Sequence, residues 1–343
     1  MDVQQNRENI FDFIGSIDEA LQERLVRQEY YGMIIVRLMG GLGNQMFQYA
    51  AGLRLAHSHQ TELKLDLSFL LDRSPRENFT YRDLDLVVFN FPITTASPEE
   101  VRQFQRLRSS GSRNLLRRIA NKMTRRHYYV EKHLGCDRSV LELPNDTYLD
   151  GYFQHENYFS DIDHIIRDRF RLAPDESRLP TATRRLADKI RLDDAVCLHV
   201  RRADYVTNAF INRIHGICSL DYYERGLAKL RSLGVSGRVF VFSDDEQWCR
   251  DNFIDASQFE IVGDEHAGPR ASTHLWLMIL CRHFLISNSS FSWWAAWLSN
   301  HPGKVVVRPS QWLRARESLN VDICPAPWIK ISNESASVAA NVL

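Results

Sequence analysis

The chain has 343 residues, a length that suggests two domains, and its 44% hydrophobic and 25% charged residues are ordinary for a globular protein. Its 43 Lys and Arg balance 43 Asp and Glu, so charge gives no support to a nucleic-acid partner. Six scattered cysteines without a C-x-x-C pair, a polar N-terminus and the lack of a bilayer-length apolar run favour a reduced, cytoplasmic protein.

Residues 1–31 are expected to form an N-terminal extension. Apolar residues recur there at three- and four-residue steps, which indicates one face of an amphipathic helix: Ile10, Ile14, Ile17, Leu21 and Leu25. This face would pack on the same protein or, in a homo-oligomer, on a second copy through 10–25. Membrane contact is the less favoured alternative.

Residues 33–38 predict a strand that runs into the glycine-rich turn 40–43 and then into a helix. Glycines let backbone approach a ligand, and a helix start offers free N–H groups to an anion. The spacing is neither G-x-G-x-x-G nor a P-loop, so a tight strand-to-helix corner is the plainer interpretation. Asn44 and Gln45, directly after the turn, favour ligand contact.

A basic segment follows at 102–132. Its Arg and Lys side chains are interleaved with an apolar stripe of Leu115, Leu116, Ile119 and Met123. A solvated face of a helix is the more common explanation, and peripheral contact with an anionic membrane surface is the alternative.

Residues 148–159 combine aromatic and polar side chains. Sugars stack on aromatic faces and hydrogen-bond to Gln and Glu, so this segment predicts part of an acceptor cleft, with an edge strand as the alternative. The polar segment 173–183, which contains Pro174 and Pro180, is the linker predicted between the domains.

The second half alternates strands and helices. Strands are expected at 194–200, 238–242, 259–262, 284–286 and, as the last one, 305–307, with helices at 221–233, 275–283 and 293–298. This rhythm predicts a parallel sheet covered by helices. Three strands end in the polar clusters HVRRAD, SDDE and SNSSFS, which the crevice rule brings to one edge of the sheet.

The HVRRAD cluster stands out because a buried strand delivers four charged or titratable residues within six positions. Neighbours in a strand point to opposite faces, so Arg201 and Arg202 are expected to differ, one facing an anionic ligand and the other a structural carboxylate. Alone, the cluster fits an ion pair that ends a strand equally well. Together with the other clusters it predicts a nucleotide-diphosphate site, and two such domains suggest a glycosyltransferase. A metal site at Asp244-Asp245 is not expected, because Arg already can neutralise a leaving diphosphate.

Five motifs in this order resemble glycosyltransferase family 11, the α-1,2-fucosyltransferases, as found in bacteria: GGLGNQMFQYAAGL (40–53), GYFQHENYF (151–159), HVRRADY (199–205), VFSDD (241–245) and SNSSFSWWAAWL (287–298). The resemblance implies an α/β fold of GT-B type, two Rossmann-like domains (32–172 and 184–330) facing across a cleft, followed by a tail, 331–343. It implies inverting transfer of L-fucose from GDP-fucose to the 2-hydroxyl of a terminal galactose, without a metal or other cofactor, from the cytoplasmic side of the membrane.

The resemblance also assigns residues. Arg201 would bind the β-phosphate, His199 would lie against guanine or ribose, Asp204 would order the loop, and Asp244 or Asp245 would contact guanine. The other donor-binding candidates are Gly41, Gly43, Asn44, Gln45, Ser243, Asn288, Ser289, Ser290, Phe291 and Ser292. The acceptor-side candidates are Asp150, Tyr152, Gln154 and Glu156, of which Asp150 and Glu156 are candidates for the general base by position only.

Two residues depart from the pattern, and the 1–31 extension lies outside it. His274 stands where similar proteins usually carry Asp, which puts a nucleotide contact or the donor preference in question, and Ala295 stands where Gly is frequent. Transfer of another GDP-sugar or to another linkage, and an inactive GDP-sugar-binding protein, remain as alternatives.

Overall fold

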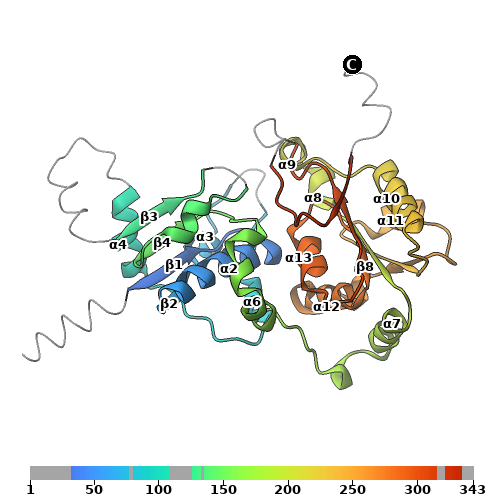
Figure 1. Cartoon of the computed structure of the whole chain (residues 1–343), viewed down its shortest axis with the longest axis horizontal. Helices are drawn as coiled ribbons and strands as arrows, with labels where there is room; N and C mark the ends of the chain where they lie inside the picture. The colour runs from blue at the N-terminus through green and yellow to red at the C-terminus, as the bar shows by residue number, and fades with distance from the viewer. Residues whose placement is uncertain (1–31, 77–79, 109–125, 133–134, 315–320, 334–343) are drawn as a thin grey trace, which may run out of the picture.

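The computed structural model describes residues 32–76, 80–108, 126–132, 135–314 and 321–333. These residues form two lobes, each built on a parallel sheet (Figure 1). The extension helix predicted at 10–25, the apolar stripe at 115–123 and most of the tail lie outside the described residues. No described helix is both long and apolar enough to cross a bilayer.

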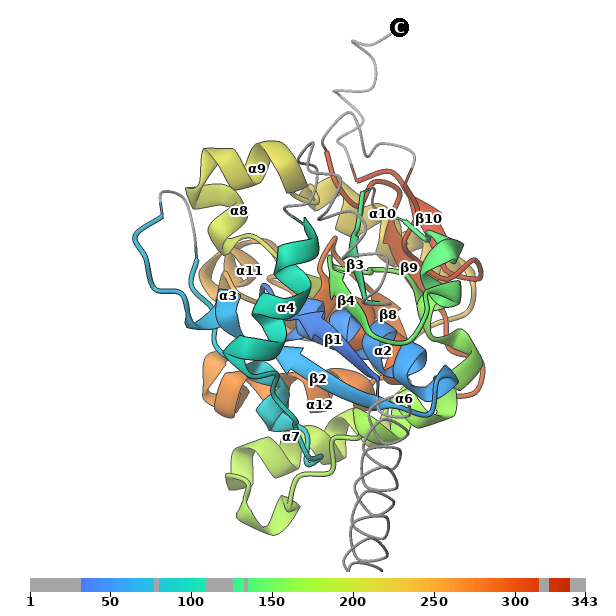
Figure 2. The ribbon, with the colours of Figure 1, turned by 90° about the vertical axis from the view of Figure 1, so that its left-hand side faces the viewer.

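The first lobe has a four-stranded sheet in the order β2-β1-β4-β3. Its strands are β1 (Met33–Arg37), β2 (Glu62–Asp66), β3 (His127–Val130) and β4 (Thr147–Asp150), and its helices are α2 (Leu42–Ser58), α3 (Ser68–Leu71), α4 (Pro98–Arg108) and α6 (Asp163–Arg169). Side chains alternate across β1, so Ile34 and Val36 pack in the cluster that contains α2, and Ile35 packs with α4. Figure 2 looks onto this lobe, with α2 and α4 on either side of β1.

The second lobe has a six-stranded sheet in the order β10-β9-β8-β5-β6-β7. Its strands are β5 (Val196–Val200), β6 (Val239–Ser243), β7 (Phe259–Val262), β8 (His283–Leu285), β9 (Val306–Pro309) and β10 (Ile329–Ile331). Its helices are α7 (Thr181–Leu192), α8 (Ala203–Thr207), α9 (Ala209–His215), α10 (Leu220–Ser232), α11 (Glu246–Asn252), α12 (Ser272–Leu280) and α13 (Ser290–Leu298). Short 3-10 helices lie at Asp85–Val88, Arg138–Glu142, Glu156–Tyr158, Ser160–Ile162, Glu176–Arg178, Asp264–His266 and Pro269–Ala271.

Two expectations about strands are wrong. Residues 127–130, expected within the basic helical segment, form β3, because Tyr128 stacks on Tyr148 of the neighbouring strand with ring centroids 4.7 Å apart. Residues 305–307 are not the last strand, since Ile329–Ile331 adds β10 beside β9. The other strands predicted in the second half coincide with β5 to β9 to within two residues.

The strand order determines where a ligand can bind. In the second sheet the chain first moves outward from β5 to β6 and β7, then returns to the other side of β5 with β8, which is the doubly wound Rossmann order. The order reverses between β5 and β8. In the first sheet β1 and β4 are also central neighbours, but the chain reaches β4 from the edge strand β3. The expected GT-B class of fold, two Rossmann-like lobes, is therefore confirmed.

One hydrophobic cluster joins the lobes. Phe47 of α2 lies 4.5 Å and 4.8 Å, ring centroid to centroid, from Trp293 and Trp294 of α13. Phe159 stacks on Trp294 at 5.4 Å from the first-lobe side. Both tryptophans are fully buried. The lobes are thus fixed against each other by aromatic packing between α2 and α13.

Candidate functional site

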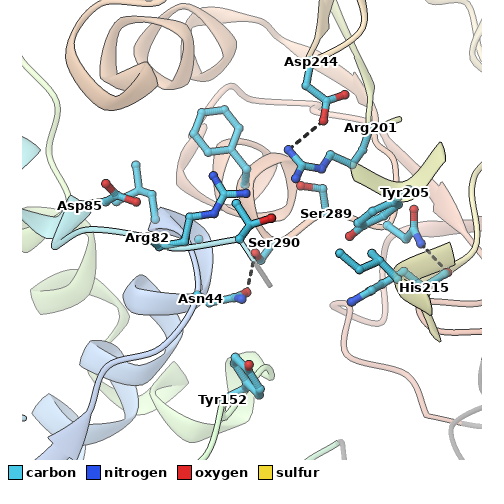
Figure 3. Close-up of a pocket in the computed structure, with 18 of the residues that line it drawn as sticks. Asn44, Arg82, Asp85, Tyr152, Arg201, Tyr205, His215, Asp244, Ser289 and Ser290 are labelled. Carbon is cyan, nitrogen blue, oxygen red and sulfur yellow. Dashed lines mark hydrogen bonds and ion pairs between the residues drawn. The ribbon is translucent and has the colours of Figure 1, made fainter. Parts of the chain in front are cut away.

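A cavity of about 910 Å³ lies between the lobes. The first lobe lines it with the turn after β1 and the segments that follow β3 and β4, and the second lobe with the residues after β5, β6 and β8 (Figure 3). The central strands of both sheets therefore end at the same space, and the convergence predicted for HVRRAD, SDDE and SNSSFS is observed.

The floor of this cavity is the contact between the starts of α2 and α13. A Cβ added at Gly43 would lie 2.5 Å from the Ser290 carbonyl carbon, so only glycine allows this approach. Asn44 Oδ1 accepts hydrogen bonds from Ser290 Oγ at 2.7 Å and from Gln154 Nε2 at 2.8 Å. Gly43, a predicted donor-binding residue, thus joins the lobes.

Both helix starts face the cavity without a side-chain cap. Gly41 is the N-cap of α2 and Ser289 is the N-cap of α13. No side-chain capping hydrogen bond is made at either position. Unsatisfied N–H groups and the positive ends of two helix dipoles therefore meet on the cavity floor. This arrangement favours an anionic ligand.

Two guanidinium groups extend toward the same point. Arg201 comes from the second lobe and Arg82 from the first, and Figure 3 shows both reaching toward Ser290. A Cβ added at Gly41 would lie 4.0 Å from Arg82 Nε, so Arg82 lies over the glycine turn. Arg201 Nη1 lies 2.9 Å from Asp244 Oδ2, and its guanidinium lies over the Tyr205 ring at 5.4 Å.

Asp244 orders the loop that carries Arg201. Its Oδ1 accepts hydrogen bonds from the backbone N–H groups of Arg202 at 2.8 Å and Ala203 at 3.2 Å. Arg202 points away, pairs with Asp245 at 3.2 Å and lies over the Trp248 ring at 4.2 Å. The predicted division between the two arginines is confirmed for Arg202, which braces the fold against a carboxylate.

His199 lies in the cavity wall as a neutral ring. Its Nδ1 is 2.8 Å from Ser287 Oγ, and its side chain is buried. Burial, with smaller effects from Arg201 and His274, lowers the pKa of His199 to about 3. His274 also lines the cavity: its Nε2 donates to the Gly263 carbonyl at 3.0 Å, and burial lowers its pKa as well. Positive charge at this end therefore comes from arginine.

Other predicted residues also line the cavity. They are Ser243, Asn288, Ser289, Phe291, Tyr152 and Gln154. The Asn288 side chain stabilises the cavity wall, because its Nδ2 donates to the carbonyls of His215, Gly216 and Trp312. Asp204 lies in α8, but its side chain is outside the described part of the structure.

Five predicted residues lie away from the cavity lining. Gln45 is buried, and its amide bonds the backbone of Gly40, Asp83, Asp85 and Leu86. Asp245 caps α11, and Ser292 Oγ donates to the Ser289 carbonyl. Asp150 pairs with Arg37 at 3.3 Å, and Glu156 accepts from Trp297 Nε1 at 3.3 Å. Both candidates for the general base are therefore engaged in holding the structure.

The sequence reasoning missed several cavity residues. They are Arg82, Asp85, Glu131, Tyr205, Phe210, Ile211, Ile214, His215 and Arg270. Arg82 and Asp85 do not come directly after a strand, so no strand end pointed to them. The helices α8 and α9, which form the apolar wall of the cavity, were not predicted. Glu131, by contrast, directly follows β3, so a correct strand prediction at 127–130 would have placed it at the sheet edge.

The described residues contain no group of three or more His, Cys, Asp or Glu side chains placed to hold a metal ion.

The chain is similar to known glycosyltransferases. The model of glycosyl transferase family 11 matches residues 111–332. An α-1,2-colitosyltransferase of Escherichia coli is 31% identical over 87% of this chain and 99% of its own length. A galactoside 2-α-L-fucosyltransferase of Caenorhabditis elegans is 26% identical over 93% and 85%. The NodZ α-1,6-fucosyltransferase crystal structure, soaked with GDP-fucose, is 16% identical, with a TM-score of 0.44 over 78% and 92%. The chain belongs to glycosyltransferase family 11.

Proposed function

We propose that this enzyme transfers L-fucose from GDP-fucose to the 2-hydroxyl of a terminal galactose on a glycan, with inversion at the anomeric carbon and without a metal. One observation carries the donor half of this proposal: two guanidinium groups and two uncapped helix starts, contributed by both lobes, converge on one cavity. A diphosphate is the part of a nucleotide sugar that fits such a site.

The same groups account for catalysis. As the bond between C1 of the sugar and the β-phosphate oxygen breaks, negative charge builds on the GDP that leaves. Arg201, held by Asp244 and the Tyr205 ring, is already oriented before that charge develops. A fixed cation of this kind stabilises the transition state more than the ground state and takes the place of a metal ion.

Replacement of Arg201 tests this proposal. Arg201→Ala is expected to lower kcat/KM for GDP-fucose by about 10³-fold, the scale of losing one electrostatic stabiliser, while the protein stays folded. Asp244 retains its two backbone donors, which supports the loop in the variant. Arg250→Ala on the surface of α11 is the matched control and should transfer at the wild-type rate. Transfer by Arg201→Ala near the wild-type rate would reject the role.

Colitosyl transfer is the second candidate, because the relative named α-1,2-colitosyltransferase is 31% identical over nearly its whole length. GDP release measured with GDP-fucose, GDP-colitose and GDP-mannose on a panel of galactosides separates the donors, and NMR of the product assigns the linkage. Thermal stabilisation by GDP without turnover on any donor would instead indicate an inactive binding protein.

A further inference from the structure

We propose that Glu131 is the general base that deprotonates the acceptor hydroxyl, an inference that rests on the proposed function. Glu131 directly follows β3 at the edge of the first sheet and lines the cavity together with Tyr152 and Gln154. It therefore stands on the lobe opposite Arg201, where an acceptor facing the donor sugar would lie.

Two backbone N–H groups hold the Glu131 carboxylate in one orientation. Its Oε2 accepts the Tyr152 N–H at 2.6 Å and its Oε1 accepts the Phe153 N–H at 3.1 Å. Gly151 leaves the room for it, because a Cβ there would lie 2.9 Å from Oε2. Phe153 has a φ of 51°, an uncommon backbone conformation for a bulky residue. Backbone strain beside an oriented polar group is typical of functional sites.

Orientation leaves the carboxylate able to take a proton. Each carboxylate oxygen has two lone pairs and uses one for a backbone N–H, so one on each oxygen stays available. The described residues place no Lys, Arg or His within ion-pair distance of Glu131. Burial raises the pKa of Glu131 against the opposing effect of the two N–H donors, which makes it a stronger base than an exposed carboxylate.

The other carboxylates on the cavity wall are less suited to this role. In the described residues they are Asp85, Asp244 and Asp264. Asp85 pairs with Arg270 at 2.9 Å, and Asp244 pairs with Arg201. Asp264 is exposed and belongs to the second lobe, which provides Arg201. Glu131 is thus the first-lobe carboxylate of the cavity that is not bound to a guanidinium.

The chemical step balances with this assignment. The acceptor hydroxyl oxygen forms the new bond to C1 of the donor sugar, and its proton passes to a Glu131 carboxylate oxygen. The bond from C1 to the β-phosphate oxygen breaks, and its electron pair leaves with GDP. Glu131 later releases the proton to solvent.

The test compares isosteric variants of two carboxylates on the same lobe. Glu131→Gln is expected to bind GDP by calorimetry like the wild type, while kcat for transfer to a galactoside falls by about 10²- to 10⁴-fold. Glu99→Gln, altered on an exposed side chain of α4 that pairs with Arg102 at 2.7 Å outside the cavity, should keep kcat within a few fold. In Glu131→Ala, added formate should restore part of kcat, which a purely structural role would not allow.

The outcomes separate the two proposals. Transfer by Glu131→Gln within about threefold of the wild type, or an equal loss in both Gln variants, overturns the assignment of the base while the proposed function stands. A wild-type enzyme that transfers from no GDP-sugar rejects the proposed function and this inference with it.

Discussion

Two positions of the turn after β1, Gly40 and Gly43, require glycine for different physical reasons. Gly40 has a φ of 75°, which a side chain would strain, whereas Gly43 has an ordinary backbone but no room for a Cβ. The sequence predicted that Gly43 faces the donor, since a glycine turn before a helix suits an anion. Gly43 does line the cavity, and it also touches the backbone of Ser290 in the other lobe, which no local pattern reveals.

Gly43→Ala is therefore expected to lower the free energy of unfolding by about 1–3 kcal/mol, the usual cost of forcing extra volume into a tight contact. Gly41→Ala is the matched control, because a Cβ at Gly41 meets nothing closer than Arg82 Nε at 4.0 Å. Urea denaturation of both variants measures the difference. Equal stability of the two would contradict the close contact.

His199 makes stability depend on pH in the acid range. The unfolded chain protonates this histidine near its ordinary pKa of 6.5, whereas the folded protein resists protonation until about pH 3. The unfolded state therefore binds more protons between these values, and stability falls as pH is lowered through them. The slope from this group is at most about 1.4 kcal/mol per pH unit. His199→Gln should show a shallower decline from pH 6.5 to 4 in denaturant titrations, and parallel curves would contradict the neutral, buried ring.

At the scale of elements, the loop before α12 lines the cavity and contacts the first lobe. Arg270 and Ala271 both have left-handed backbone, with φ of 51° and 57°, and Arg270 Nη1 lies 2.9 Å from Asp85 Oδ1 of the first lobe. Burial raises the pKa of Asp85, and its bond to Arg270 counteracts this rise. The strained loop thus holds one guanidinium in place as a link between the lobes.

Arg270→Lys and Arg270→Ala test this link. Loss of the pair in Arg270→Ala is expected to speed GDP dissociation several-fold in stopped-flow experiments, with little change in Tm because the pair is partly exposed. The GDP dissociation rate of Arg270→Lys should lie between those of Arg270→Ala and the wild type. A dissociation rate unchanged in both would show that the pair does not restrain the bound nucleotide.

Elements were predictable where a buried apolar run ended in a polar cluster, as in β5 with His199 and β8 with Ser287. They were missed where the apolar signal was short. β10 has three residues, and β3 begins with His127 at the end of a basic segment. Helices α8 and α9, which supply Tyr205 and Phe210 to the cavity, carry no clear amphipathic period, so the apolar cavity wall went unpredicted.

At the scale of the molecule, the two lobes share one hydrophobic core. Trp294 is fully buried and packs against Phe47, Phe159 and Phe170 of the first lobe. The strand rhythm predicted a parallel sheet covered by helices, and the family resemblance implied two Rossmann-like domains facing across a cleft. Neither revealed that α13, the helix after the SNSSFS cluster, belongs as much to the interface as to its own sheet, because the partner aromatics are remote in sequence.

A shared core predicts that both lobes unfold together. Calorimetry of the wild type should give a single transition, and Trp294→Ala should lower its free energy of unfolding by about 3–5 kcal/mol without splitting it. Leu192→Ala, at a largely exposed position, is the control and should leave Tm unchanged. Two transitions, only one of them shifted by Trp294→Ala, would contradict a common core.

The contact between Gly43 and Ser290 also decides how the lobes can turn. Backbone touches backbone there, and Trp294 Nε1 donates to the Gly43 carbonyl at 2.9 Å, so this point has no freedom to slide. Any rotation of one lobe must have its axis close to this point. A rotation moves atoms in proportion to their distance from the axis, so the floor with its two helix starts keeps its shape. We therefore expect the two helix starts on the floor to keep their mutual geometry in every arrangement of the lobes, so that the proposed diphosphate site is already formed before a substrate enters.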